Sequence, residues 1–221
     1  MCTNIAQYQR NSDYGIAFGL QPEVLRNWKD PRRPTYAAPV GAMVWAFNCF
    51  KSPSTVLPNT AVWGYRPDWA AEQNLPVVGR ANIRNFIRKP YWLPLWEAGQ
   101  RALVPIDGWH EWRADGLPYY VRRQHGQPMF AAALTDYVGR GPVRQLRVVL
   151  LCAPSNHSAV NADSLQPILV PAPYRRSWIQ FSPADEMLSM ARFLALPDDL
   201  VSYPISRRLS DPTANGPELI R

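Results

Sequence analysis

The sequence is poor in lysine and cysteine, and it has no long apolar run. Three of the 24 basic residues in the 221-residue chain are lysines, and the three cysteines, Cys2, Cys49 and Cys152, lie far apart. Their odd number and spacing exclude a disulfide framework and a CxxC pair, so we expect reduced thiols. No stretch approaches the roughly 18 apolar residues of a membrane span, and the N-terminal residues do not show a basic segment followed by an apolar one, the pattern expected of a secretory leader. We therefore expect a soluble, cytoplasmic protein without a membrane partner.

Several standard catalytic and cofactor motifs are also missing. His110 and Glu111 begin an HE pair, but Ala114 stands where the HExxH zinc motif needs its second histidine. No other His or Cys cluster has the spacing of metal ligands. The chain also lacks the GxSxG turn, the P-loop and the GxGxxG turn. The sequence therefore predicts no metal and no cofactor.

Arginine and proline, by contrast, are abundant. The net charge is +7, with 21 arginines among the basic residues. Guanidinium groups suit phosphate oxygens and stack on bases, so this excess favours a nucleic-acid partner, although a genome rich in G and C produces the same bias. The 23 prolines are about twice the usual share of ~5%. Because proline interrupts helices, short strands joined by fixed turns are expected.

The hydrophobic pattern predicts an α+β fold. Segments rich in β-branched and aromatic residues recur between turn signals. The predicted strands are 43–47, 60–65, 101–106, 109–113, 119–123, 129–134 and 146–152, and the predicted helices are 23–28, 173–180 and 184–194. Runs of strands with helices toward the ends favour one compact domain over residues 1–221, with a largely antiparallel, barrel-like sheet and flanking helices that form a basic groove.

The N-terminus carries the most unusual chemical signal. If Met1 is removed, Cys2 presents a free α-amine beside its thiol. Such an amine has a reference pKa of about 7.7–8.0, so part of it is neutral near neutral pH and can attack an aldehyde. The thiol can then close a thiazolidine ring without ATP or a metal. A cysteine at this position can also be accidental.

Three further segments carry polar or aromatic side chains in suggestive order. In an extended strand Glu111 shares a face with Trp109, where a carboxylate can act as a general acid or base. Asn82 and Arg84 would likewise share a face, pairing an amide with a phosphate-binding guanidinium. The segment 63–69, WGYRPDW, offers rings that can stack on unpaired bases. Exposed strand residues and an ordinary aromatic core are the plainer explanations.

Taken in order, these pieces resemble the SOS response-associated peptidase family, whose members process abasic sites in DNA. The matching segments are MC at 1–2, YAAP at 36–39, WGY at 63–65 with Trp69, NIRN at 82–85, RALVPIDGWHEW at 101–112, MFAAAL at 129–134, PILV at 167–170 and YPIS at 203–206. The ordered set, above all the initial Cys with the DGWxEW segment, is specific.

The resemblance implies roles for the matching residues. Cys2 would capture the ring-opened aldehyde of an abasic deoxyribose, Glu111 would promote ring opening and proton transfer, and Asn82 would position the sugar. Arg84 would bind phosphate. Pro39, Trp63 and Trp69 resemble the DNA-facing wedge of the family, with Trp69 the foremost stacking residue. An alignment to the family without a gap would instead match Arg80, and not Asn82, to the residue that positions the sugar.

The chain also departs from the family pattern. Thr3 and Asn4 stand where the family often has Gly-Arg, which removes a cationic contact near the nucleophile. The family histidine that precedes the Pro-Ile-Leu run is missing. Asp163 lies closest to its place and His157 is the nearest histidine, but a carboxylate cannot replace an imidazolium. The chain therefore lacks the residue to which the resemblance assigns β-elimination or cross-link reversal.

Three functions follow as alternatives. The first is a sensor of abasic sites in single-stranded DNA that forms a thiazolidine cross-link through Cys2, with self-processing peptidase and lyase activity implied by the resemblance. A noncovalent single-stranded nucleic-acid-binding module that has lost this chemistry is the second. The third is an N-terminal-nucleophile peptidase acting on proteins, which leaves the DNA-facing segments unexplained. The sequence does not fix the oligomeric state.

Overall fold

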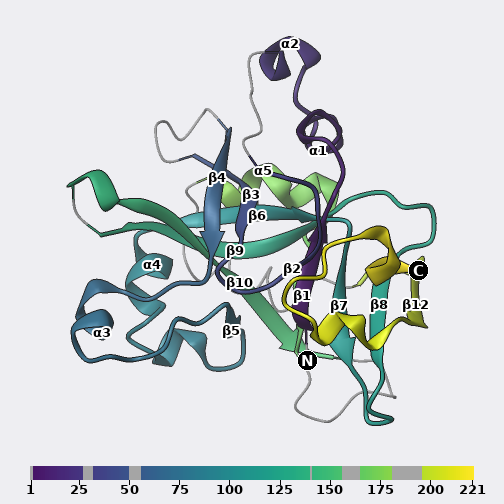
Figure 1. Cartoon of the computed structure of the whole chain (residues 1–221). Helices are drawn as coiled ribbons and strands as arrows, with labels where there is room; N and C mark the ends of the chain where they lie inside the picture. Colours follow the sequence, from purple (N-terminus) through teal and green to yellow (C-terminus); the bar gives the residue numbers. More distant parts are fainter. Residues whose placement is uncertain (1, 27–31, 50–55, 140, 156–164, 181–195) are drawn as a thin grey trace.

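The computed structural model describes residues 2–26, 32–49, 56–139, 141–155, 165–180 and 196–221, without the side chains of residues 2, 3, 57 and 143. Figure 1 shows strands crossing the centre of the molecule, with α1 and α2 projecting at one end. The strands are β1 Cys2–Gln7, β2 Thr35–Ala38, β3 Met43–Asn48, β4 Leu57–Trp63, β5 Arg80–Asn82, β6 Arg101–Ile106, β7 Gly108–Trp112, β8 Pro118–Arg123, β9 Met129–Val138, β10 Gln145–Pro154, β11 Leu165–Pro167 and β12 Leu200–Pro204.

The helices are short, as the prolines predict. The α-helices are α1 Asn11–Phe18, α2 Pro22–Leu25, α3 Asp68–Glu72, α4 Leu93–Glu97 and α5 Arg175–Ile179, and the 3₁₀ turns are η1 Phe86–Arg88, η2 Gly141–Val143, η3 Ala172–Tyr174, η4 Arg207–Ser210 and η5 Pro217–Ile220. No helix in the described ranges is long and apolar enough to cross a membrane.

Five strands close into a barrel. They pair in the order β10, β4, β3, β6 and β9, and β9 pairs with β10 again. The β10–β4 pairing is parallel and the others are antiparallel. Beyond the barrel, β5 pairs with β10 in parallel and β11 pairs with it antiparallel. The predicted α+β class with a largely antiparallel, barrel-like sheet is confirmed.

A second, five-stranded sheet lies against the barrel, in the order β12, β8, β7, β1 and β2. Asp107 alone separates β6 of the barrel from β7 of this sheet. The buried Gln7 side chain joins the two layers, because its amide donates to the Trp45 and Pro105 carbonyls and accepts from the Trp45 N–H. This bonding satisfies a buried amide that would otherwise be costly.

Both faces of the barrel strands are covered. Along β6, Ala102, Val104 and Ile106 belong to one buried cluster with Trp109 of the second sheet. Leu103, on the opposite face, packs in another cluster with the helix tryptophans Trp96 and Trp178, among others. Alternation of side chains along a strand explains this division. It also explains why β6 shows no polar face, since every residue of it is buried.

Most of the predicted strands form, with ends shifted by a few residues. The segment predicted as 60–65 is β4, Leu57–Trp63, and ends two residues earlier. The helix predicted as 173–180 is divided into η3 and α5. In the described residues the helix predicted as 23–28 is α2, Pro22–Leu25, and the predicted helix 184–194 lies outside them. The division of the chain as one domain stays a prediction.

The buried Asp107 carboxylate at the junction of the sheets predicts a pH-dependent stability. Its Oδ2 accepts from the Tyr14 hydroxyl at 2.6 Å and from the backbone N–H groups of Tyr8 and Gln9. Burial nevertheless raises the pKa of Asp107 to about 6 from 3.8. An acid with a raised folded-state pKa contributes stability below its unfolded pKa, and this is lost as pH rises through the folded value.

At 1.36 kcal/mol per pKa unit the full shift corresponds to about 3 kcal/mol. Because the unfolded carboxyl is already partly ionised at pH 4, we expect the Asp107 contribution to fall by about 2 kcal/mol between pH 4 and 7. Asp107→Asn keeps an oxygen acceptor but has no charge to lose. The difference in free energy of unfolding between the two proteins, measured by urea titration from pH 4 to 7, should change by that amount in favour of the variant. Parallel pH curves would contradict this prediction.

Candidate functional site

The N-terminal strand brings Cys2 opposite Glu111. β1 runs antiparallel to β7, and the Cα partners in the register are Cys2 with Glu111 and Asn4 with His110, with an irregularity between Cys2 and Asn4. Directly opposed residues on paired strands have Cα atoms about 4.5–5.5 Å apart. The two residues to which the sequence assigns nucleophile and acid–base roles are therefore cross-strand neighbours.

Glu111 is buried and held by a cation. Its side chain is 1% exposed, and its Oε1 accepts from Nε and an Nη of Arg113 at 3.2 and 3.1 Å. Arg113 also lies over the ring of Tyr119 at 3.9 Å and donates to the Ser202 hydroxyl. Tyr119 is the residue opposite Glu111 on β8, and Ser202 belongs to β12. Three strands thus fix the position of this carboxylate.

Asn82 ends a strand in the other sheet. It lies opposite Cys152 on β10, whose other neighbour is Pro167 of β11. The expected extended face shared by Asn82 and Arg84 is wrong, because the chain turns there: Asn82 Oδ1 accepts the backbone N–H of Arg84 at 3.0 Å. This local bond competes with strand extension. The structure therefore places Arg84 in an exposed turn.

The route from Asn82 to Cys2 runs through neighbouring strands. β5 pairs with β10, β10 pairs with β11, and β11 contacts β1. Figure 1 shows the end of β10 near the N-terminus and β5 beside it. Cys2 and Glu111 are thus direct neighbours on paired strands. Asn82 is connected to them only through the intervening strands β10 and β11. Arg80, the alternative to Asn82, begins the same short strand.

Trp63 is not a surface residue. It is completely buried, and its indole N–H donates to the Gly79 carbonyl at 2.7 Å. The prediction that Trp63 faces DNA is wrong, because its ring is part of the buried cluster that also contains Val104 and Trp109. Trp69 differs from it, with 37% of its surface exposed and its ring edge-on to Tyr91 at 5.4 Å.

Pro39 lies at an exposed turn beside an apolar rim. Val40 and Val77, which belong to none of the motifs quoted above, are about 40% exposed. Gly64 has a φ of +122°, and a Cβ on it would lie 2.8–2.9 Å from the methyl groups of both valines. The glycine after Trp63 therefore allows these two side chains to close over the chain. Only their exposure in the folded chain identifies them, because no sequence pattern marks them.

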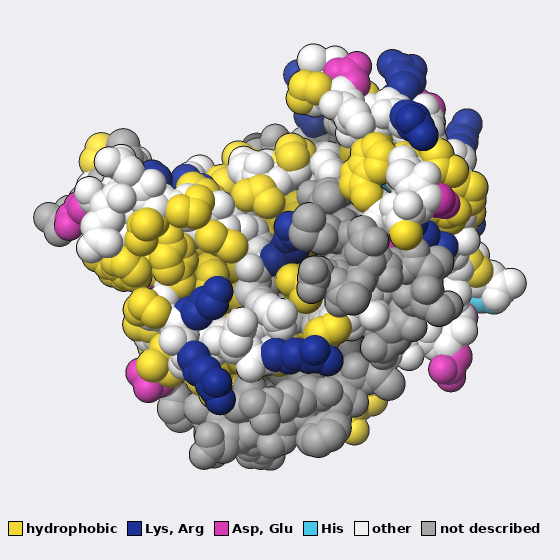
Figure 2. All heavy atoms as spheres, turned by 90° about the horizontal axis from the view of Figure 1, so that it is seen from below, with side chains coloured by type: hydrophobic (Ala, Val, Ile, Leu, Met, Phe, Trp, Pro, Cys, Tyr) yellow, Lys and Arg dark blue, Asp and Glu magenta, His cyan; other side chains and the backbone are white. Residues whose placement is uncertain are grey.

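Basic side chains gather on one face. Arg84, Arg88 and Lys89 are exposed near the end of β5. Figure 2 shows the molecule from below, with several Lys and Arg side chains over the middle of this face, Asp and Glu at its margins, and an apolar patch on one side. Clustered positive charge attracts phosphate backbones without sequence preference. His157 and Asp163, which the sequence analysis weighed for the missing histidine, lie outside the described residues.

His110 is a buried residue that serves the fold. Burial lowers its pKa to about 4, and its Nε2 lies 2.9 Å from the Leu219 carbonyl oxygen, which requires an N–H donor on that nitrogen. A neutral imidazole bonded in this way ties β7 to the C-terminal turn. In the described part of the chain no three His, Cys, Asp or Glu side chains are grouped so as to hold a metal ion.

The fold matches solved structures over nearly its whole length. A phage-related protein from Bordetella bronchiseptica is similar with a TM-score of 0.75 at 21% identity, over 93% of this chain and 95% of that one. A protein from Bacteroides thetaiotaomicron is similar with a TM-score of 0.77 at 17% identity, over 100% and 99% of the two chains. The class is thus an α+β protein with this arrangement of barrel and second sheet.

Sequence comparison identifies the family. Residues 1–212 match the family described as SOS response associated peptidase (SRAP), and the chain belongs to that family. It is also 27% identical over 164 residues to the abasic site processing protein YedK of Escherichia coli strain K12, which covers 72% of each chain. The resemblance inferred from the ordered motifs is confirmed.

Proposed function

We propose that this protein recognises abasic sites in single-stranded DNA and joins itself to them through a thiazolidine formed by Cys2, once Met1 is removed. The observation that carries the proposal is the register of β1 and β7, which pairs Cys2 with the buried Glu111. Family membership and the similarity to an abasic site processing protein support it.

The proposed reaction conserves every atom except one water molecule. The neutral amine of Cys2 adds to C1′ of the ring-opened deoxyribose, and the resulting carbinolamine loses water to form an imine. The cysteine sulfur then adds to the imine carbon, and the thiol proton passes to the nitrogen. Glu111 would donate a proton to the departing hydroxyl and accept one during ring opening, the work of a general acid–base group.

The remaining residues would bind the strand. Arg84, exposed beyond β5, would contact phosphate, and Asn82 would position the sugar. Trp69 and Pro39, next to the apolar rim of Val40 and Val77, would stack on the unpaired bases. Phosphate contacts would give salt-dependent affinity without sequence preference. Specificity for the lesion would come from the covalent step, because only an aldehyde reacts.

The test compares two oligonucleotides that differ only in the C1′ hydroxyl group of one sugar. One carries an abasic site and the other a tetrahydrofuran analogue, which cannot open to an aldehyde. We expect a band that resists denaturing electrophoresis with the first only, and an intact mass equal to protein plus DNA minus one water. Equal noncovalent binding to both with no adduct would contradict the proposal and favour a binding module.

A specific observation favours that second candidate, a noncovalent module. Asn4, at the position where the family often has a cation, donates its side-chain amide to the Ala37 carbonyl at 3.0 Å. It therefore braces β1 against β2 and supplies no charge to DNA. Intact-mass measurement of the purified protein separates the candidates further, since a retained Met1 blocks the amine. Cys2-dependent hydrolysis of a generic protein would instead support a peptidase.

Trp69 should carry a measurable share of the affinity for DNA. Stacking on one base contributes ~1–3 kcal/mol, so Trp69→Ala should weaken binding by about 5- to 150-fold. Fluorescence anisotropy with the tetrahydrofuran oligonucleotide measures this without interference from the covalent step. Tyr174→Ala, which removes another exposed ring, is the control and should bind normally. Unchanged affinity in Trp69→Ala would remove this residue from the proposed interface.

A further inference from the structure

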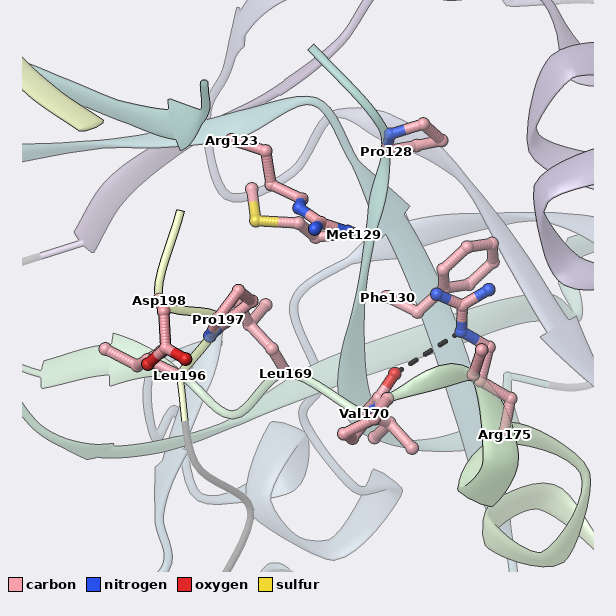
Figure 3. A pocket seen from close by; sticks show the side chains of 12 residues that line it. Arg123, Pro128, Met129, Phe130, Leu169, Val170, Arg175, Leu196, Pro197 and Asp198 are labelled. Carbon is pink, nitrogen blue, oxygen red and sulfur yellow. Dashed lines mark hydrogen bonds between the residues drawn. The ribbon is translucent and has the colours of Figure 1, made fainter. Parts of the chain in front are cut away.

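A concave site lies away from Cys2 and Glu111, around the far end of β8. An open cavity of about 390 Å³ is lined by the end of β8, the start of β9, the chain that follows β11, the start of α5 and residues 196–198. Figure 3 shows side chains from these five segments around one space. Its volume is within the range of about 300–1,000 Å³ that is typical of small-molecule sites.

The floor of this cavity is apolar and rigid. Met129, Phe130, Leu169 and Val170 line it, and each is 4% exposed or less. Two backbone pairings fix the floor, because Val170 N–H donates to the Phe130 carbonyl and Ala131 forms a bridge with Leu169. A ligand with an apolar body would therefore meet a preformed surface and would cause little reorganisation of the protein.

Two guanidinium groups face the same cavity. Arg123 donates from Nε to both carboxylate oxygens of Asp199, at 3.0 and 2.9 Å, so its charge is paired. Arg175 lies over the Phe130 ring at 4.0 Å and donates to the carbonyl oxygens of Val170 and Ala17. Carbonyl groups orient a cation, but they do not neutralise it.

Among the residues that the structure describes, Arg175 is thus a half-buried cation without a carboxylate partner. Within the described residues no Asp or Glu oxygen lies at salt-bridge distance from it. Burial, and then the neighbouring charge of Arg123, lower its pKa to about 10, which still leaves it charged at neutral pH. Asp198 lines the cavity, but Figure 3 shows it on the opposite wall. The missing counter-charge would be supplied by a bound anion.

This cavity is separate from the site of Cys2 and Glu111. Arg123 lies four residues along β8 from Tyr119, the partner of Glu111, which is about 13 Å on a strand. Met129 pairs with Ile106, five residues before Glu111 in the chain. An occupant of the cavity would therefore not compete directly with DNA chemistry at Cys2.

We infer that this cavity binds a small organic anion, in which one carboxylate or phosphate group accepts from Arg175 and an apolar body covers Met129, Leu169 and Val170. Hydrogen bonds between a guanidinium and an anionic oxygen are the strong class, and partial burial strengthens them. The orientation is fixed by charge, with the anionic end at Arg175 and the neutral end toward Asp198.

The experiment uses 2-naphthoate as the probe and 2-naphthamide as its uncharged counterpart, each titrated into the full-length protein by calorimetry. Naphthoate should bind with a Kd below about 1 mM, and naphthamide at least tenfold more weakly. Arg175→Gln should weaken naphthoate binding by about 10- to 100-fold, as expected for loss of a hydrogen bond to a charged group. Arg176→Gln, which changes the exposed neighbour, should bind normally.

Two further variants keep the test decisive. Ala172→Trp places a large side chain at the exposed rim of the cavity and should block the probe even if Arg175→Gln fails to fold. Cys2→Ala should bind naphthoate as the unaltered protein does. Equal binding of the two probes, normal binding by Ala172→Trp, or loss of binding in Cys2→Ala would each overturn the inference.

Discussion

Replacement of Glu111 by glutamine is expected to slow formation of the covalent link by about 10²–10⁴-fold, the usual contribution of a general acid–base group. The carboxylate lies opposite Cys2 on the paired strand, and it is 1% exposed. Opening of the sugar, loss of water from the carbinolamine and closure of the ring all move protons. An amide of the same shape can neither donate nor accept these protons at useful rates.

The fold should survive this change, which makes the kinetic result interpretable. Glutamine retains an oxygen that can accept from Arg113, so the three-strand arrangement with Tyr119 and Ser202 stays in place. The rate is measured from the covalent band over time at saturating abasic oligonucleotide, with Cys2→Ala as the zero-rate reference. Glu97→Gln, at an exposed helix position, is the matched control. A rate within threefold of normal would exclude Glu111 from the chemistry.

Arg113 gives this carboxylate its single orientation. A buried carboxylate without a cation is costly, so removal of Arg113 would leave Glu111 unpaired and typically costs ~3–5 kcal/mol. Arg113 is itself fixed by the face of Tyr119 and the hydroxyl of Ser202. The chain therefore positions Glu111 from β8, the next strand, and from β12, which is far from it in sequence. These supporting residues belong to no motif that sequence reasoning used.

The barrel strands β6 and β9 were predictable because they are largely continuous apolar runs between turn residues. β6 and β9 are buried on both faces, so composition identified them without any alternation. β1 was missed for the opposite reason, since CTNIAQ is half polar. Its place is determined by long-range contacts, with Gln7 bonded to β3 and β6 and Asn4 bonded to β2. A local pattern does not contain such contacts.

The sequence predicted the site residues that strand pairing brings together. It predicted poorly which side chains are exposed on the surface. The pairing of Cys2 with Glu111 agrees with their expected proximity. Trp63 and Trp69 look equivalent in sequence, yet one fills the core and the other is 37% exposed. Asn82 and Arg84 were expected on one strand face, but the Asn82 side chain bonds the next turn and ends the strand. Single side-chain bonds of this kind override a period-two pattern.

The glycine of the DGW motif is required for packing, and this leads to the second large effect. Gly108 begins β7 directly after the Asp107 junction. A Cβ at this position would overlap the carbonyl oxygen of Val121 and the phenol end of Tyr120, both well under 3.0 Å away. Tyr120 is completely buried, and Val121 pairs with Trp109 in the β7–β8 ladder. Neither neighbour can withdraw without loss of that pairing.

Gly108→Ala is therefore expected to destabilise the protein by about 3 kcal/mol or more, at the upper end of overpacking penalties. At ~2–4 °C per kcal/mol for a chain of this size, the melting temperature should fall by about 6–12 °C. Gly126→Ala is the control, because its added methyl would meet nothing within 4 Å and only its φ of +71° adds a cost of ~1 kcal/mol. Thermal unfolding of both variants separates the two causes. Gly108 does not have a positive φ, so a loss in Gly108→Ala no larger than that in Gly126→Ala would mean that β8 relaxes around the added methyl, and the packing argument would fail.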